Sequence, residues 1–486
     1  MKRCISVLLG LLLLVSLLAC NPSVPQSSGT DDPPDPGIMV PGEGEPSLPP
    51  SGTPDESPDE AIDDPPAEVV LRVRRSALVL PVGRSENVEA KTENTEDALV
   101  YESGNPSVAT VDALGNVTGV AEGETAVTVS CGSKAVTCAV TVGARKKSVR
   151  ASEIDTSAFV NTFGRNYFAN SLYCMEYVAS GFEISFYGSS LSAELWADRE
   201  SYLVVYADGE PTDTIRLDPG ERKVYNLFEA DEKGEHTVKV LKRTELLLST
   251  VGMTGIKTED GYFLSPPARN TRRIEVFGDS ITSGYGNLGA MGTTMSPANS
   301  DGLQTYATLA AEAVGADIQV VSCSGYGLYT SRWGDGIIPP LFTKTTQNHP
   351  TRWDATRYVP DVVIVNLGTN DGANVAGNSR DNMPLFTAEA YKAAYKDFIA
   401  EIQAAYPGVQ ILCCFGLMGN ACYEEIKSTI TDMCAEYTAA GDDSVQYLFF
   451  DKITETERGC ASHPNVAAHT KAAVILAARL TELFGT

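Results

Sequence analysis

Three apolar runs in the C-terminal half of the chain each end in glycine and small polar residues, and this pattern constrains the fold most. The runs at 274–277, 318–321 and 360–367 lead into Gly278-Asp279-Ser280, Gly325 and Gly368-Thr369-Asn370-Asp371. Further strand patterns lie at 409–415 and 445–450, and helical patterns lie at 306–314, 388–406, 423–440 and 466–484. Strands that alternate with helices are typical of a parallel sheet covered by helices, so we expect an α/β fold for residues 270–486.

The ends of these strands carry the residue types that acyl transfer requires. In an open α/β sheet the functional crevice lies beyond the carboxyl ends of the strands. Ser280 stands in the turn after the first run, and His463 lies in a loop near the C-terminus. A hydroxyl and a neutral imidazole can act as nucleophile and base, and the Gly325 backbone and Asn370 side chain can donate hydrogen bonds to an oxyanion.

In chain order, these residues resemble the sequence blocks of the SGNH (GDSL-like) hydrolase superfamily. The blocks match at Gly278-Asp279-Ser280, at Gly325, at Gly368-Thr369-Asn370-Asp371 and at His463, within residues 270–486. The resemblance implies a three-layer α/β domain with Ser280 as nucleophile and His463 as base. It also implies an oxyanion hole formed by the N–H groups of Ser280 and Gly325 and the amide of Asn370. Gly327 is an alternative to Gly325 as the second-block glycine.

Structural roles are the alternative for several of these residues. Asn370 and Asp371 are common turn residues, and Gly325 can serve backbone geometry alone. The other histidines fall in a strand pattern, a polar loop and an alanine-rich helical pattern: His236, His349 and His469. The presence of all the blocks in family order favours the catalytic interpretation.

One departure from the family pattern concerns the acid that usually orients the histidine. Many SGNH enzymes have an Asp three residues before the His, and here Cys460 occupies that position. His463 still needs one ring nitrogen fixed so that the other can accept the serine proton. We expect a main-chain carbonyl of the loop before His463 to do this, with Asp451, at the end of the preceding strand, as the alternative.

The N-terminus predicts export and anchoring. A positively charged start precedes a short apolar run that ends in Leu17-Leu-Ala-Cys20, which is typical of a signal peptide and too short for a stable membrane span. The ending resembles the bacterial lipobox, which implies a lipoprotein signal peptide at residues 1–19 and lipidation of Cys20. The alternative is a secretory signal with an incidental cysteine. We therefore expect a lipid-anchored protein of the bacterial cell envelope, on the outer membrane or the cell surface.

The segment that follows has the composition of a disordered acidic tether. Residues 20–68 contain no Lys or Arg and are rich in Pro, Gly, Ser, Asp and Glu. Such a segment cannot bury enough apolar surface to fold, and its prolines and like charges keep it extended. It contributes to a formal net charge of −26 for the chain, which argues against nucleic acid as a partner.

Two β-rich segments separate the tether from the α/β domain. Residues 69–145 alternate strand patterns with turn signals and, at 105–129, resemble the group 2 bacterial Ig-like domain, which implies a small β-sandwich. Residues 150–266 have strand patterns at 181–186, 202–206 and 236–241 and suggest a second sandwich. Residues 181–184, 206–210 and 236–245, with Pro266-Pro267, resemble carbohydrate esterase family 2, in which a jelly roll precedes an SGNH domain.

The chain has 11 cysteines, of which Cys4 would leave with the signal and Cys20 would carry lipid. An odd number remains, so at least one cysteine has no partner within the chain. Cys131 and Cys138 flank a possible hairpin turn, and the sequence leaves open whether they pair. No cysteine–histidine spacing suggests a zinc site, and the expected chemistry requires neither a metal nor a cofactor.

The family resemblance implies a carbohydrate acetyl esterase. It would remove O-acetyl groups from polysaccharides such as acetylated xylan or glucomannan through an acetyl-enzyme, with a leaning to the 6-hydroxyl of hexoses. Trp333 follows the second block in a predicted surface loop and is expected to contact the sugar, with core packing as the alternative. Two other functions stay open: another SGNH esterase, lipase or glycan deacetylase, and a non-catalytic surface glycan-binding protein.

Overall fold

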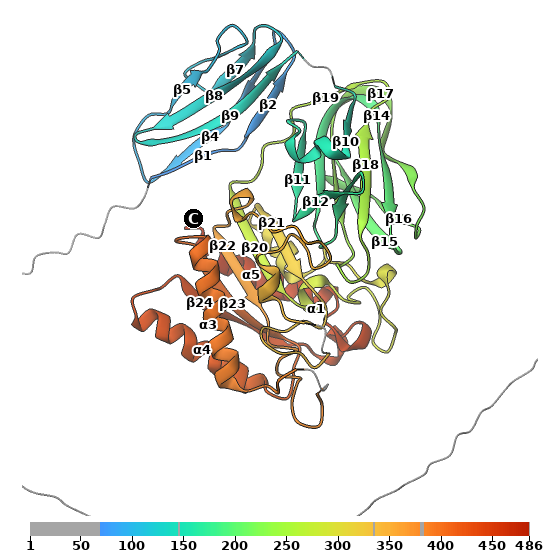
Figure 1. Ribbon diagram of the computed structural model, residues 1–486, viewed down its shortest axis with the longest axis vertical. Helices are drawn as coiled ribbons and strands as arrows, with labels where there is room; N and C mark the ends of the chain where they lie inside the picture. Colours follow the sequence, from blue (N-terminus) through green and yellow to red (C-terminus); the bar gives the residue numbers. More distant parts are fainter. Residues whose placement is uncertain (1–68, 144–145, 334–335, 380–382, 486) are drawn as a thin grey trace, which may run out of the picture. The chain divides into compact units, whose positions relative to one another are not determined.

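The computed structural model describes residues 69–143, 146–333, 336–379 and 383–485 (Figure 1). The predicted signal peptide, the lipidation site at Cys20 and the tether to residue 68 lie outside the described residues. Among the described helices, none has the length and apolar character that a membrane span requires.

The first described domain consists of β-strands only. A four-stranded sheet has the order β2-β9-β8-β5, a three-stranded sheet has the order β3-β7-β6, and β1 pairs with β4. The bounds are β1 Val70–Val73, β2 Ala77–Leu80, β3 Ser85–Asn87, β4 Ala90–Glu93, β5 Val100–Ser103, β6 Ala109–Val111, β7 Asn116–Gly119, β8 Gly123–Cys131 and β9 Lys134–Val142. Cys131 and Cys138 are both free thiols, because in the β8–β9 register Cys138 lies opposite Val127. The expected Ig-like β-fold is confirmed.

The second domain is a ten-stranded antiparallel sheet around one core. Its strands are β10 Ser148–Arg150, β11 Val160–Phe163, β12 Asn166–Ala169, β13 Leu172–Met175, β14 Gly181–Ala197, β15 Ser201–Ala207, β16 Glu210–Leu217, β17 Lys223–Lys242, β18 Val251–Lys257 and β19 Tyr262–Leu264. Strands β14 and β17 are far longer than the sequence predicts, and register shifts after Gly188 and Leu191 bend their pairing. Such bulges let one strand contribute to two parts of a curved sheet.

The third domain has the predicted α/β architecture. A five-stranded parallel sheet has the order β21-β20-β22-β23-β24. Its strands are β20 Arg272–Gly278, β21 Ala316–Ser322, β22 Val362–Asn366, β23 Gln410–Leu417 and β24 Val445–Lys452. The helices are α1 Ser280–Ser283, α2 Tyr306–Ala313, α3 Ala388–Ala405, α4 Tyr423–Ala439 and α5 Val466–Leu483. Short 3₁₀ helices lie at Ala151–Thr156, Pro297–Asn299, Pro339–Leu341, Ala355–Arg357, Glu455–Glu457 and Cys460–Ser462.

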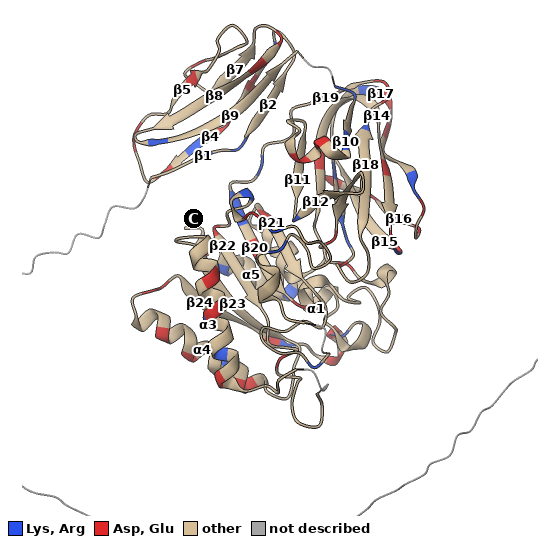
Figure 2. Ribbon diagram, in the orientation of Figure 1, with Lys and Arg blue, Asp and Glu red and all other residues tan. Residues whose placement is uncertain are grey.

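Helices cover both faces of this sheet and create two apolar cores. One core joins the sheet to α3 and α4, and the other joins it to α2 and α5. Figure 2 shows acidic positions along α4, whose buried side chains include Ile426, Ile430 and Met433. The strand order reverses around β20, so the switch point of the sheet lies beside the end of the strand that leads to Ser280.

A buried ion pair connects the second and third domains. The Arg165 guanidinium lies 2.7 Å from a carboxylate oxygen of Glu275 on β20, and both side chains are inaccessible to solvent. Arg165 also donates to the main-chain oxygens of the connection after β21: Leu341, Phe342 and Lys344. The Tyr406 hydroxyl donates to Glu275 at 3.0 Å. Charges can be buried in this way because each is paired and hydrogen-bonded.

We expect Glu275→Gln to lower the free energy of unfolding by about 3–5 kcal/mol, because the buried Arg165 guanidinium loses its counter-charge. Urea unfolding can be followed by tryptophan fluorescence, since the Trp353 ring centroid lies 4.9 Å from the Arg165 guanidinium carbon. The control is Arg216→Met, which removes an ion pair to Glu200 whose Arg side chain is 52% exposed, and which should change stability by about 1 kcal/mol or less. Equal effects of the two changes would contradict the prediction.

Candidate active site

Ser280 is placed by a sharp turn at the end of β20. Gly278 has no side chain because a Cβ there would lie 2.0 Å from the Thr282 hydroxyl oxygen. The Asp279 carboxylate accepts a hydrogen bond of 2.9 Å from Ile281 N, and Ser280 is the first residue of α1. Burial raises the pKa of the Asp279 carboxyl to about 7. The strand, turn and short helix therefore fix the serine at the carboxyl edge of the sheet.

His463 lies within hydrogen-bond distance of the serine. Its Nε2 is 2.8 Å from Ser280 Oγ, and its Nδ1 is 3.3 Å from the Ala461 main-chain oxygen. Ala461 and Ser462 have φ values of 47° and 62°, a left-handed backbone that is unusual for residues with a side chain. This turn directs the Ala461 main-chain carbonyl at the imidazole. The sequence analysis expected a carbonyl of the loop before His463 in this position.

Cys460 occupies the place where the family pattern has an acid. Its side chain is fully buried, and its Sγ lies 3.0 Å from the Thr293 hydroxyl oxygen. A Cβ at Gly286 or Gly289 would come within 2.4 Å or 2.2 Å of Cys460 atoms, so this pair of glycines makes room for the thiol. Asp451, the alternative acid, instead lines a separate cavity beside β24 and α5.

The other predicted donors face the same space as the serine. Gly325 has a left-handed φ of 83°, which favours glycine, and follows β21. The Asn370 amide follows β22 and donates to the Tyr326 main-chain oxygen at 2.8 Å. Ser280, Gly325, Asn370 and His463 all line one cavity of about 580 Å³. A hydroxyl, an imidazole and hydrogen-bond donors, the groups that acyl transfer requires, thus converge in one place.

Gly327 and Asp371 have structural roles in the same region. Gly327 does not line the cavity, and a Cβ there would come within 1.8 Å of the Thr330 main-chain oxygen. The Asp371 carboxylate accepts hydrogen bonds from the N–H groups of Leu328, Tyr329 and Thr330. Burial raises the pKa of this carboxyl to about 6, although these hydrogen bonds oppose the shift. Asp371 therefore fixes the loop that follows Gly325.

Comparison with known proteins gives three family matches. Residues 276–471 match the GDSL-like Lipase/Acylhydrolase family, residues 162–267 match the carbohydrate esterase 2 N-terminal domain, and residues 71–142 match the group 2 bacterial Ig-like domain. The chain contains a GDSL-like hydrolase domain that follows a carbohydrate esterase 2 N-terminal domain in the sequence. This pair of domains is the one that the sequence resemblance predicted.

Two curated relatives are similar to parts of the chain. Cellulase/esterase CelE of Acetivibrio thermocellus is 30% identical over 312 residues, which are 63% of this chain and 37% of that protein. An acetylxylan esterase / glucomannan deacetylase of Cellvibrio japonicus is 32% identical over 190 residues, which are 38% of this chain and 53% of that protein. The chain thus spans about a third to a half of the length of these two relatives.

A solved structure extends the likeness to three dimensions. A family two carbohydrate esterase from Clostridium thermocellum, in complex with cellohexaose, superposes with a TM-score of 0.62 at 28% identity. The superposition covers 67% of this chain and 99% of the Clostridium thermocellum esterase chain.

The hydrolase domain brings further residues to the cavity that sequence reasoning missed. The Tyr285 ring centroid lies 4.4 Å from that of His463. Asn420, in the loop after β23, donates to the main-chain oxygens of Gly368 and Thr369 at 3.1 and 3.2 Å. The strand-end pattern that identified Asn370 also applies to the loop after β23, so it could have found Asn420.

Trp333 lies at the rim of the cavity. Its side chain is 41% exposed, and the Arg332 guanidinium carbon lies 4.8 Å from its ring centroid. Both residues line the same cavity as Ser280. An exposed aromatic face beside the serine is a suitable surface for a sugar ring, as the sequence interpretation proposed.

The remaining histidines lie away from the hydrolase cavity. His469 Nδ1 accepts a hydrogen bond of 3.2 Å from Tyr306 N, at the start of α2, and burial lowers the pKa of His469 to about 3. His236 Nδ1 lies 2.9 Å from an Asp208 carboxylate oxygen. The His349 ring stacks on Tyr167 with a centroid distance of 4.0 Å. The contacts of His469, His236 and His349 therefore indicate structural roles for these three side chains.

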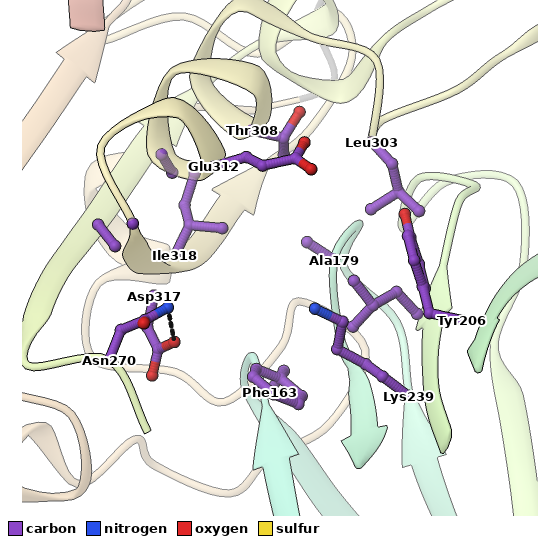
Figure 3. A pocket seen from close by; sticks show the side chains of 14 residues that line it. Phe163, Ala179, Tyr206, Lys239, Asn270, Leu303, Thr308, Glu312, Asp317 and Ile318 are labelled. Carbon is purple, nitrogen blue, oxygen red and sulfur yellow. Dashed lines mark hydrogen bonds between the residues drawn. The ribbon is translucent and has the colours of Figure 1, made fainter. Parts of the chain in front are cut away.

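A second cavity of about 200 Å³ lies between the esterase 2 N-terminal domain and the hydrolase domain. Figure 3 shows Lys239 and Phe163 on one side of this cavity and Asn270 and Asp317 on the other. The Asn270 amide donates a hydrogen bond of 3.1 Å to the Asp317 carboxylate. The predicted catalytic residues do not line it. Across the described residues, no group of three or more His, Cys, Asp and Glu side chains could hold a metal ion.

The geometry predicts a low pKa for His463. Burial lowers this pKa to about 4, below the ordinary value of 6.5, and the Ala461 carbonyl opposes the shift only in part. The neutral, proton-accepting ring should therefore dominate at every pH above about 4. An NMR titration of ¹³C-labelled histidine, with the His463 signal assigned by its loss in His463→Gln, measures the value directly.

Asp451→Asn is the control for this titration. Because its carboxylate lines a different cavity, the change should leave both the His463 titration and kcat unaltered. A His463 pKa of 6.5 or above would contradict the arrangement described here, and so would a shift of that pKa in Asp451→Asn.

Proposed function

We propose that this protein is a serine esterase that removes O-acetyl groups from polysaccharides. The observation that carries the proposal is the distance of 2.8 Å between Ser280 Oγ and His463 Nε2, inside a cavity that Gly325 and Asn370 also line. The expected substrates are acetylated xylan or glucomannan, with a preference for the 6-O-acetyl group of hexoses. The names of the esterase relatives support the carbohydrate substrate class.

In the first half-reaction, Ser280 Oγ attacks the acetyl carbonyl carbon while His463 Nε2 takes the hydroxyl proton. The carbonyl oxygen becomes an oxyanion, which the N–H groups of Ser280 and Gly325 and the Asn370 amide stabilise. His463 then gives its proton to the sugar oxygen as the C–O bond breaks. The deacetylated sugar hydroxyl leaves, and the acetyl group stays on Ser280.

In the second half-reaction, water replaces the sugar. His463 Nε2 takes a proton from the water as its oxygen attacks the acetyl carbonyl, and the same donors stabilise the second oxyanion. The proton returns to Ser280 Oγ as the acyl bond breaks, and acetate leaves. The Ala461 carbonyl fixes the imidazole tautomer through Nδ1 in both half-reactions, because a neutral ring carries a hydrogen on only one nitrogen.

The aromatic residues around the serine fit a sugar better than a long acyl chain. Trp333 presents an exposed face at the rim, and Tyr285 lies against His463. The related esterase structure contains cellohexaose, a chain of hexoses. Hydrolysis of 4-nitrophenyl acetate together with acetate release from acetylated glucomannan would support the proposal. Preference for medium-chain nitrophenyl esters would instead favour a lipase-type activity, and glycan binding without hydrolysis would favour a surface binding protein.

Ser280→Ala should lower kcat for 4-nitrophenyl acetate by several orders of magnitude, because the nucleophile is lost. Asn370→Ala should lower kcat by about 10²–10³-fold with little change in KM, because its amide acts mainly on the oxyanion of the transition state. Steady-state kinetics on purified variants measures both effects. Near-normal turnover in Ser280→Ala would end the assignment, and a rise of KM at constant kcat would make Asn370 a substrate-binding residue.

We further propose that the protein is held in the bacterial cell envelope by lipid on Cys20. The support is the sequence alone: the lipobox-like Leu17-Leu-Ala-Cys20 and the acidic, proline-rich stretch behind it. Cys20→Ser should move the protein from the membrane fraction to the soluble fraction without loss of activity on a soluble ester. Fractionation followed by immunoblotting measures this, and an unchanged distribution would exclude lipid as the anchor.

A further inference from the structure

The connection between β17 and β18 of the N-terminal esterase domain reaches the hydrolase cavity. Leu246 is fully buried in the core that contains α3 and α4, and Leu247 lines the cavity beside Ser280. Arg243, at the start of this connection, donates to the main-chain oxygens of Pro297 and Ala298 in the hydrolase domain. A segment of one domain therefore forms part of the active-site wall of the other.

Glu245 in this connection is hydrogen-bonded to the loop that carries Gly325. One carboxylate oxygen accepts from Ser324 N at 3.0 Å, and the other accepts from Ser324 Oγ at 2.7 Å. Ser324 directly precedes Gly325, and both residues line the cavity. The Glu245 side chain is only 2% exposed, so these two hydrogen bonds are shielded from water.

The Glu245 main chain is itself held by a buried lysine. Lys242 Nζ donates to the main-chain oxygens of Glu176, Thr244 and Glu245 at 2.9, 2.6 and 3.2 Å. Lys242 is inaccessible to solvent, and burial lowers its pKa to about 7. Burial also raises the pKa of Glu245, and the hydrogen bonds from Ser324 are the largest opposing cause. A hydroxyl network behind Lys242 joins Ser201, Thr244 and Ser249. These hydrogen bonds hold the main chain that carries the Glu245 carboxylate in place.

We propose that Glu245 is a positioning residue for the oxyanion hole, supplied by the N-terminal domain to the hydrolase domain. The inference rests on the proposed esterase function. By fixing Ser324 at both its N–H and its hydroxyl, Glu245 holds the next peptide group, so that the Gly325 N–H faces the acetyl oxygen. Glu245 does not touch the substrate, and it acts on Gly325 through Ser324.

The physical reason is preorganisation. An oxyanion hole accelerates a reaction because its donors are already oriented before charge develops, and a donor that must first be reoriented loses much of its effect. Gly325 has a left-handed backbone and no side chain, so packing alone constrains it weakly. Ser331 constrains it on one side by donating its hydroxyl to the Gly325 main-chain oxygen, and the two hydrogen bonds from Ser324 to Glu245 constrain the preceding peptide group.

The test compares Glu245→Ala, Glu245→Gln and the wild-type full chain on 4-nitrophenyl acetate. Glu245→Ala should lower kcat by about 10–100-fold with KM changed little, which is a partial loss of one oxyanion donor. Glu245→Gln keeps one acceptor oxygen and should recover part of kcat. Hydrogen exchange of peptides that span residues 322–327 should become faster in Glu245→Ala, and this readout does not depend on activity.

The matched control is Glu183→Ala on β14, which removes another largely shielded carboxylate of the same domain that has no contact with Lys242 or Glu245. Its side chain accepts from the Asn161 amide at 3.2 Å, and burial raises its pKa. The control should lower the melting temperature but leave kcat and the exchange of residues 322–327 unchanged.

Unchanged exchange of residues 322–327 in Glu245→Ala would overturn the positioning role, and so would equal losses of kcat in Glu245→Ala and Glu183→Ala. Full activity of Glu245→Ala alongside an inactive Ser280→Ala would overturn the positioning role and leave the esterase function standing. Absence of esterase activity in the wild type, with faster exchange in Glu245→Ala, would instead refute the esterase function.

Discussion

The buried pair of Arg165 and Glu275 is the interaction on which the arrangement of the second and third domains depends. Neither charge has access to water, so each must find all its partners within the protein. Arg165 binds the carboxylate of Glu275 and three main-chain oxygens of the hydrolase domain through its two terminal nitrogens, and its Nε has no hydrogen-bond partner among the described residues. Since Glu275 lies on β20, the strand that ends at Gly278, the same pair fixes the strand that presents Ser280. The domain interface and Ser280 are therefore stabilised by the same ion pair.

The carboxyl edge of the parallel sheet then assembles the site from short, separately fixed loops. Asp371 binds the loop after β21 through three N–H groups, Asn420 binds the loop after β22 through two main-chain oxygens, and Glu245 binds Ser324. Each constraint is a side chain, buried for Asp371 and Glu245 and half-buried for Asn420, that is hydrogen-bonded to backbone. Loops at strand ends would otherwise be the least constrained parts of the domain. Hydrogen bonds from polar side chains thus fix the loops at this edge of the sheet, whereas apolar packing fixes the interior.

Much of this organisation was predictable because it is local in sequence. Strand and helix periodicity gave the parallel sheet with its helices, and the strand ends gave Ser280, Gly325 and Asn370 as neighbours. The sequence did not give the length of β14 and β17, because bulges that let a strand continue around a bend leave no periodic signal. Nor did it indicate Tyr285 beside His463 or Glu245 beside Ser324, since these contacts depend on how distant segments pack. The family pattern indicated that Cys460 stands in the place of an acid, but it did not indicate that Gly286 and Gly289 make room for the thiol.

The carbonyl behind His463 has a consequence for charge. In a site with a carboxylate at that position, the reacting groups would carry one negative charge before and after proton transfer. Here a neutral serine, a neutral imidazole and a neutral carbonyl become an imidazolium and an oxyanion, whose charges cancel. The groups that react therefore pass from a small dipole to a large one without a change of net charge. The carbonyl differs from a carboxylate in lacking the fixed negative charge that would stabilise the imidazolium, so the donors to the oxyanion supply a larger share of the stabilisation of this charge pair.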